Sequence, residues 1–171
     1  MSDFTFPENC KIVNGFTALG IGTAGAVYGV YVSLKLAHMA WAVINYRQGD
    51  GTQVVWGIRK ASSIAGGDVL ASTVLMPIWS NLACATSDLL VARTAAATYT
   101  LDVGQATKMV IFQVDPAALG VLAADGVTPF DCVQIWPVGG NIPVTSAWAC
   151  NWVIQPRYQS RVLTQPSVVI D

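Results

Sequence analysis

Large apolar residues alternate with small or polar ones along much of this chain, with the period of two that is typical of β-strands. The run 39–46 is a clear example, in the order Met39, Ala40, Trp41, Ala42, Val43, Ile44, Asn45, Tyr46. Because both of its faces are largely apolar, we expect a strand that is buried on both sides or lies at an interface. A second alternating run, 53–60, follows the turn sequence Gly49-Asp50-Gly51, so the pattern predicts a hairpin.

Further strands are expected at 27–34, 69–79, 99–103, 108–115, 130–136 and 145–155. The last of these places one set of side chains on a single face: Ser146, Trp148, Cys150, Trp152 and Ile154. Pro77 predicts a strand end at a sheet edge or a bulge. Asp115 followed by Pro116 is the start signal of a short helix. Residues 81–97 have only weak periodicity, so we expect a loop or a short helix there.

About six to eight short strands with few helix signals predict an all-β fold, an antiparallel β-sandwich that is jelly-roll-like. We expect three regions: a glycine-rich N-terminal arm (1–26), a β-sandwich domain (27–155) and a C-terminal arm (156–171). Pro156 and Pro166 disfavour regular structure in the last region.

The chain carries very little charge, since only 11% of its residues are Asp, Glu, Lys or Arg. Three long windows contain no charged residue at all: 12–34, 69–87 and 132–156. A monomer that must stay soluble usually keeps charges interspersed over its surface. We therefore expect much of this surface to be covered by other subunits.

Most kinds of chemistry find little support in the residues. The net charge is −1 and the basic residues are scattered, so we expect no binding to nucleic acid. His38 is the only histidine, and we interpret it as a hydrogen-bonded structural residue at the head of an apolar strand. With one histidine and no CxxC pair, we expect neither an enzyme nor a metal site, and no cofactor.

The four cysteines, Cys10, Cys84, Cys132 and Cys150, are widely spaced. We interpret them as small hydrophobic residues in a reducing compartment, and a disulfide such as Cys132–Cys150 is the alternative. The first residues lack the basic and apolar regions of a secretory signal, so we expect no exported precursor.

The uncharged window 12–34 is long enough to span a bilayer of about 30 Å. Five glycines within it, together with threonines and serine, make it a poor membrane helix, so membrane insertion is the minor alternative. The six tryptophans are Trp41, Trp56, Trp79, Trp136, Trp148 and Trp152. All of them fall in expected strands, which favours core and interface positions, and stacking on sugars is the alternative.

Several segments in order resemble a family of small virion proteins of tailed bacteriophages. These segments are 36–44, 95–100, the run 108–119 with Asp115-Pro116-Ala117-Ala118-Leu119, 132–136, and 147–158 ending in Gln155-Pro156-Arg157-Tyr158. The order of the segments carries the resemblance, which covers about Leu36 to Tyr158. The chain is similar to head decoration (cement) proteins, which bind the outside of the capsid shell.

The resemblance implies a structural virion protein at the capsid surface, assembled in the cytoplasm of a host bacterium. Its partners would be the major capsid protein and further copies of itself, with a trimer favoured. The arms would carry the partner-binding residues: Phe4, Phe6, Pro7, Tyr158, Val162, Leu163, Val168, Val169 and Ile170. Extended arms can add strands to neighbouring sheets, and repeated weak contacts over a lattice give avidity. The alternatives are a head–tail joining, tail or minor capsid protein, and a glycan-binding module.

Overall fold

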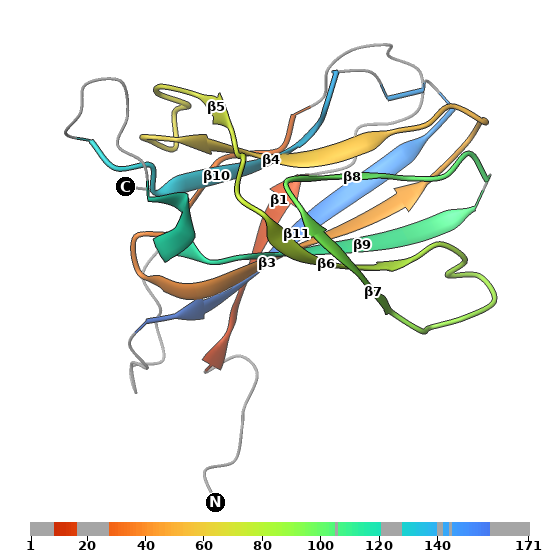
Figure 1. Cartoon of the computed structure of the whole chain (residues 1–171), viewed down its shortest axis with the longest axis horizontal. Coiled ribbons are helices and arrows are strands. Elements are labelled where there is room, and N and C mark those ends of the chain that lie inside the picture. Colours follow the sequence, from red (N-terminus) through yellow and green to blue (C-terminus); the bar gives the residue numbers. More distant parts are fainter. Residues whose placement is uncertain are drawn as a thin grey trace, which may run out of the picture.

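The computed structural model describes residues 9–16, 28–104, 106–120, 128–139, 142–143 and 145–157, and it places their strands in two facing sheets (Figure 1). The six-stranded sheet has the order β1 (Lys11–Phe16), β11 (Ala147–Pro156), β3 (Ala37–Arg47), β9 (Thr107–Val114), β6 (Met76–Asn81), β7 (Val91–Ala96). The five-stranded sheet contains β2 (Val32–Ser33), β10 (Cys132–Pro137), β4 (Val55–Ala61) and β5 (Leu70–Ala71), with β8 (Thr98–Thr100) also pairing with β4.

All of these pairs are antiparallel, and the chain passes repeatedly from one sheet to the other. The order β1-β11-β3-β9 in one sheet faces β2-β10-β4-β8 in the other, and along the chain these strands alternate between the sheets except at the step from β4 to β8, which pair with each other. Strands β5, β6 and β7 are inserted between β4 and β8. The predicted all-β antiparallel sandwich is therefore confirmed.

The inner faces of the two sheets form the core. Trp56 of β4 lies against Trp148 of β11 with ring centroids 4.8 Å apart, so the two sheets meet through aromatic side chains. Phe16 of β1 stacks on Trp148 at 4.1 Å, and Tyr46 of β3 meets Trp56 edge-on at 5.8 Å. Such ring pairs add to the stabilisation from burial alone.

Two sequence predictions are confirmed in detail. The face predicted for 145–155 is buried in β11, where Trp152 and Cys150 are fully enclosed. The short helix is the 3-10 turn η1 (Pro116–Leu119), and the Asp115 side chain accepts a hydrogen bond from the backbone N–H of Ala117 at 2.9 Å.

The predicted hairpin between 39–46 and 53–60 is wrong. Strand β3 pairs with β11 and β9, whereas β4 lies in the other sheet and pairs with β10. The turn at Gly49–Gly51 carries the chain across the sandwich, and the Gln48 side chain donates a hydrogen bond to the carbonyl of Thr52 across it. A glycine-rich turn shows where a strand ends but not which sheet the next strand joins.

The region 69–97 also differs from its prediction. The expected strand at 69–79 is divided into β5 and β6, because residues 72–75 pass from the five-stranded to the six-stranded sheet. Pro77 lies in β6 where the pairing register with β7 shifts, as expected for proline at an irregularity.

Residues 91–96 form strand β7 rather than a loop or helix. Its periodicity is weak because an edge strand with exposed residues on both faces needs no apolar alternation.

The N-terminal segments depart from their predictions in two places. Of the described residues 28–34, Val32 and Ser33 alone form a strand, and Val30 donates its backbone N–H to the Gly15 carbonyl at 2.7 Å. Within the range expected to form the N-terminal arm, Lys11–Phe16 pairs with β11 and belongs to the six-stranded sheet.

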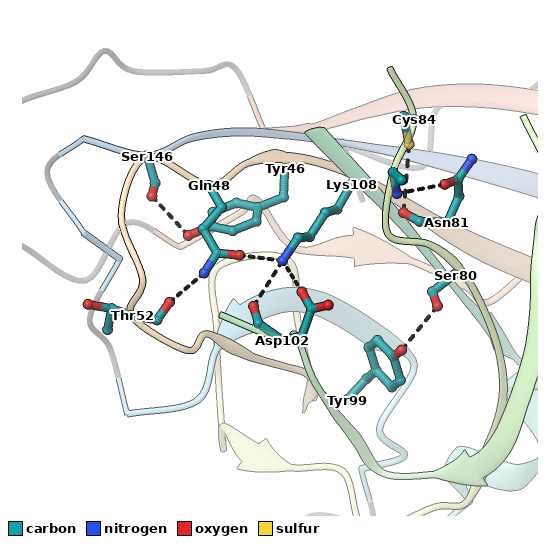
Figure 2. A network of polar contacts seen from close by, with 11 residues as sticks. Tyr46, Gln48, Thr52, Ser80, Asn81, Cys84, Tyr99, Asp102, Lys108 and Ser146 are labelled. Carbon is teal, nitrogen blue, oxygen red and sulfur yellow. Dashed lines mark hydrogen bonds and ion pairs between the residues drawn. The ribbon is translucent and has the colours of Figure 1, made fainter. Parts of the chain in front are cut away.

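A buried polar network stabilises one end of the sandwich (Figure 2). Lys108 of β9 is buried and its ammonium group contacts the Asp102 carboxylate, the Asp102 carbonyl at 2.9 Å and the Gln48 side-chain carbonyl. Tyr46 donates to the Ser146 hydroxyl at 2.9 Å, and Ser146 also accepts the backbone N–H of Gly49. A buried ammonium is tolerated only with such partners.

We predict that Asp102→Asn lowers the free energy of unfolding by about 2 kcal/mol, because the buried Lys108 ammonium loses its charged acceptor. The double variant Asp102→Asn/Lys108→Met is expected to recover much of this loss, since no buried charge is left. Urea unfolding of the three proteins measures both effects. Asp88→Asn, at an exposed aspartate, is the control. An equal loss of unfolding free energy in Asp88→Asn and Asp102→Asn would refute the role of this ion pair.

Candidate functional site

The partner-binding residues predicted in the two arms all lie outside the described residues. They are Phe4, Phe6, Pro7, Tyr158, Val162, Leu163, Val168, Val169 and Ile170. The described residues contain a different candidate, on the outer face of the six-stranded sheet.

This outer face is formed by the side chains that point away from the sandwich. We call it the apolar face and define it by Met39, Trp41, Val43, Trp79, Met109, Ile111 and Val153. Each of these side chains is half-buried, because neighbours on adjacent strands cover one another. Ile12 of β1 extends the face to the sheet edge and is 60% exposed.

The strand register makes the apolar face continuous. One row runs from Ile12 through Val153 to Trp41, and the next runs from Val43 through Ile111 to Trp79. Directly opposed residues on antiparallel strands have Cβ atoms about 5 Å apart, so their side chains touch. The apolar surface therefore crosses the sheet from β1 to β6 without interruption.

Charge is almost absent from this face. Apart from Thr107 at the end of β9, its uncharged polar members are amides: Asn14, Asn45, Asn151, Gln113 and Gln155. Arg47, at the end of β3, is the one charged side chain that points outward from the described strands of this sheet. Lys108 and Arg93 belong to the same sheet but point inward, and Arg93 donates its Nε–H to Ser80 at 2.8 Å. A contiguous apolar surface of this kind usually marks an interaction site.

The six tryptophans divide evenly between the core and the outer faces. Trp56, Trp148 and Trp152 are buried, whereas Trp41, Trp79 and Trp136 are half-buried on outer faces. All six lie in strands, as predicted. Trp41 and Trp79 belong to the apolar face, and the Trp136 ring is covered by the Arg59 guanidinium at 3.7 Å.

The reactive side chains of the described segments are scattered. His38 is exposed in β3, and no hydrogen bond to it is found among the described residues, which corrects its interpretation as a bonded structural histidine. In the part of the chain that the structure describes, no three His, Cys, Asp or Glu side chains gather as metal ligands would. All four cysteines lie in described segments and none of them is in a disulfide, so the alternative Cys132–Cys150 disulfide is not formed. Burial raises the pKa of Cys150 to about 12, which keeps its thiol protonated and unreactive.

None of the described segments is a helix with the length and hydropathy needed to span a bilayer. Within the uncharged window 12–34, the described secondary structure consists of most of β1 and all of β2.

Comparison with known proteins yields only distant likenesses. No protein-family model matches the chain, and a search of curated proteins finds no relative. Among solved structures, the SPBc2 prophage-derived protein YomS is 11% identical, with a TM-score of 0.44, and the match covers 85% of this chain and 92% of that chain. Coat protein of Tobacco streak virus, solved as a dimer, is 9% identical, with a TM-score of 0.20 over 96% of this chain and 94% of that chain. At these TM-scores and identities the likenesses establish no family and no function.

Sequence reasoning identified one strand of the apolar face, since 39–46 was expected to be apolar on both sides. It did not identify the other strands of the face, because their adjacency depends on pairings between residues as distant as Trp41 and Val153. Alternation in β9 and β11 was visible in the sequence, and only the topology shows that their outward side chains join those of β3.

Proposed function

We propose that this chain is a non-enzymatic structural protein of a bacteriophage virion that binds the outside of the capsid and stabilises or decorates it. Its main partner is the major capsid protein. The protein acts as a homo-oligomer, a trimer at a symmetry point of the lattice, and it needs no cofactor. The resemblance of segments 36–158 to phage decoration proteins suggests this role.

The observation that carries the proposal is the uncharged apolar face of the six-stranded sheet. The face spans the four inter-strand spacings from β1 to β6, and with about seven residues of strand it measures roughly 19 Å by 24 Å, or about 460 Å². A specific protein interface buries about 800 Å² on each partner, so the face would supply somewhat more than half of that area. We propose that it lies on the shell, while the arms reach neighbouring subunits.

Direct binding to particles tests this function. Purified protein is mixed with heads of the encoding phage that lack it, and the bound fraction is measured by co-sedimentation at rising salt. We expect tens to hundreds of copies per head, as repeated lattice sites require. Binding should persist at about 1 M salt, because an uncharged interface gains little from ionic attraction.

The alternatives give different results in the same experiment. A head–tail joining protein would bind at a single vertex, in about the number of a small symmetric ring. A tail protein would leave heads bare. No binding to heads at all would refute the proposed function, and a saturable change in tryptophan fluorescence with host polysaccharide would then favour the glycan-binding alternative.

A further inference from the structure

A second feature of the surface lies on the opposite side of the sandwich, on the outer face of the five-stranded sheet. The guanidinium of Arg59, in β4, contacts two aromatic rings, with its central carbon 3.7 Å from the Trp136 ring centroid and 4.7 Å from the Tyr28 ring centroid. Three segments distant in the sequence therefore meet at one arginine. We call this group the Arg59 cluster.

The rings of the Arg59 cluster are held by backbone and side-chain contacts. Trp136 lies opposite Gly57 of β4, where a Cβ atom would come within 3.3 Å of the indole nitrogen. Tyr28 is fixed through its neighbour Gly29, whose carbonyl accepts a hydrogen bond of 2.6 Å from the side chain of Gln134. Gln134 is itself only 5% exposed and lies directly opposite Arg59 on β10.

The charge of Arg59 is not neutralised within the described residues. No carboxylate pairs with it there, and no described acceptor takes a hydrogen bond from its N–H groups. The other partly or fully buried cations differ in this respect. Lys108 contacts Asp102, Lys60 donates to the Leu119 carbonyl at 3.4 Å, and Arg93 donates to Ser80.

Ring contacts and hydrogen bonds use different parts of a guanidinium. Aromatic rings attract its flat faces, whereas its five N–H groups lie in its plane and point outward. An arginine held against two rings has already lost much of its side-chain freedom, so binding a carboxylate costs less entropy. The planar fork also matches the two oxygens of a carboxylate.

We propose that the Arg59 cluster is a binding site for a carboxylate, supplied by an Asp or Glu side chain of a protein partner. A phosphate is a poorer match, because Lys60 points into the core and leaves Arg59 as the one cation of this cluster. A sugar ring is also a poorer match, since Arg59 contacts the aromatic faces on which it would stack. The site goes beyond the proposed function: it lies on the sheet opposite the apolar face, so both surfaces can be occupied at once.

The test uses the full-length protein and a small acidic probe, and needs no phage particle. The side-chain Nε–H resonance of Arg59 is followed by NMR while the peptide acetyl-Gly-Glu-Glu-Gly-amide is added. A matched peptide with glutamine in place of glutamate is the probe control. We expect a saturable shift with the glutamate peptide alone, and its loss as the pH falls below about 4, where the carboxylates are protonated.

Variants assign the binding to this arginine. Binding, followed through the backbone resonances of the cluster, should be lost in Arg59→Gln and weakened about tenfold in Arg59→Lys, because an ammonium lacks the planar fork. Arg47→Gln, an exposed arginine on the other sheet, should bind as the natural protein does. Thermal melts confirm that each variant is folded. Three results would overturn the proposal: no saturable shift, equal response to both peptides, or tighter binding of oligogalacturonate than of the glutamate peptide.

Discussion

Replacing Val43 by lysine is expected to reduce binding to phage heads at least about 100-fold while the sandwich stays folded. Val43 lies near the middle of the apolar face, directly opposite Asn151 on one side and Ile111 on the other. In the free protein a lysine at this position can extend its ammonium group into water. In the complex the same charge would be buried without a partner, which costs several kcal/mol. Co-sedimentation with heads measures the loss.

Matched variants separate this effect from a general effect of added charge. Ile111→Lys changes a neighbouring position of the same face and should reduce binding to a similar degree. Leu75→Lys adds the same charge at a leucine that is 70% exposed in the crossing between β5 and β6, and it should leave binding unchanged. If Val43→Lys binds heads normally but changes the oligomeric state in sedimentation equilibrium, the face joins copies of this chain instead and the proposed docking is wrong.

The second large effect is expected at Gly49, where the chain leaves β3. A Cβ atom added there would lie 1.9 Å from the backbone carbonyl oxygen of Thr145, far inside van der Waals contact. The clash is with backbone, so no side-chain rotation can relieve it, and the Gly49 N–H bond to Ser146 would be strained as well. We predict that Gly49→Ala lowers the free energy of unfolding by about 3 kcal/mol, measured by urea unfolding.

Gly51, two residues further along the same turn, provides the control. An added Cβ there would meet its nearest atom at 3.9 Å, so Gly51→Ala should change stability by no more than about 0.5 kcal/mol. Similar losses in the two variants would mean that backbone entropy, and not the approach of Thr145, explains the requirement for glycine.

Local patterns in the sequence predicted what depends on neighbouring residues. The alternation at 145–155 predicted a strand and its buried face, and Asp115-Pro116 predicted the start of η1, because side-chain period and capping are local properties. The hairpin that was predicted after Tyr46 does not form, because the partner of a strand is decided by packing across the whole sandwich. Strand β7 was missed because an edge strand can form without apolar alternation.

The candidate sites show the same limit. The apolar character of 39–46 was visible and indicated a strand that is buried on both sides or lies at an interface, but the extent of the face depends on the register of β3 with β9 and β11. The Arg59 cluster had no signal in the sequence, because Arg59 and Trp136 come together only through the pairing of β10 with β4, and Tyr28 joins them through the hydrogen bonds of Gly29 to β10.

The orientation of the chain in a reconstruction of the decorated capsid tests the proposed function most directly. We predict that Trp41 and Val43, on the six-stranded sheet, lie against the shell, and that Arg59 on the opposite sheet points away from it. A particle in which the chain is bound but the outer face of the six-stranded sheet is turned to solvent would contradict the role proposed for that face.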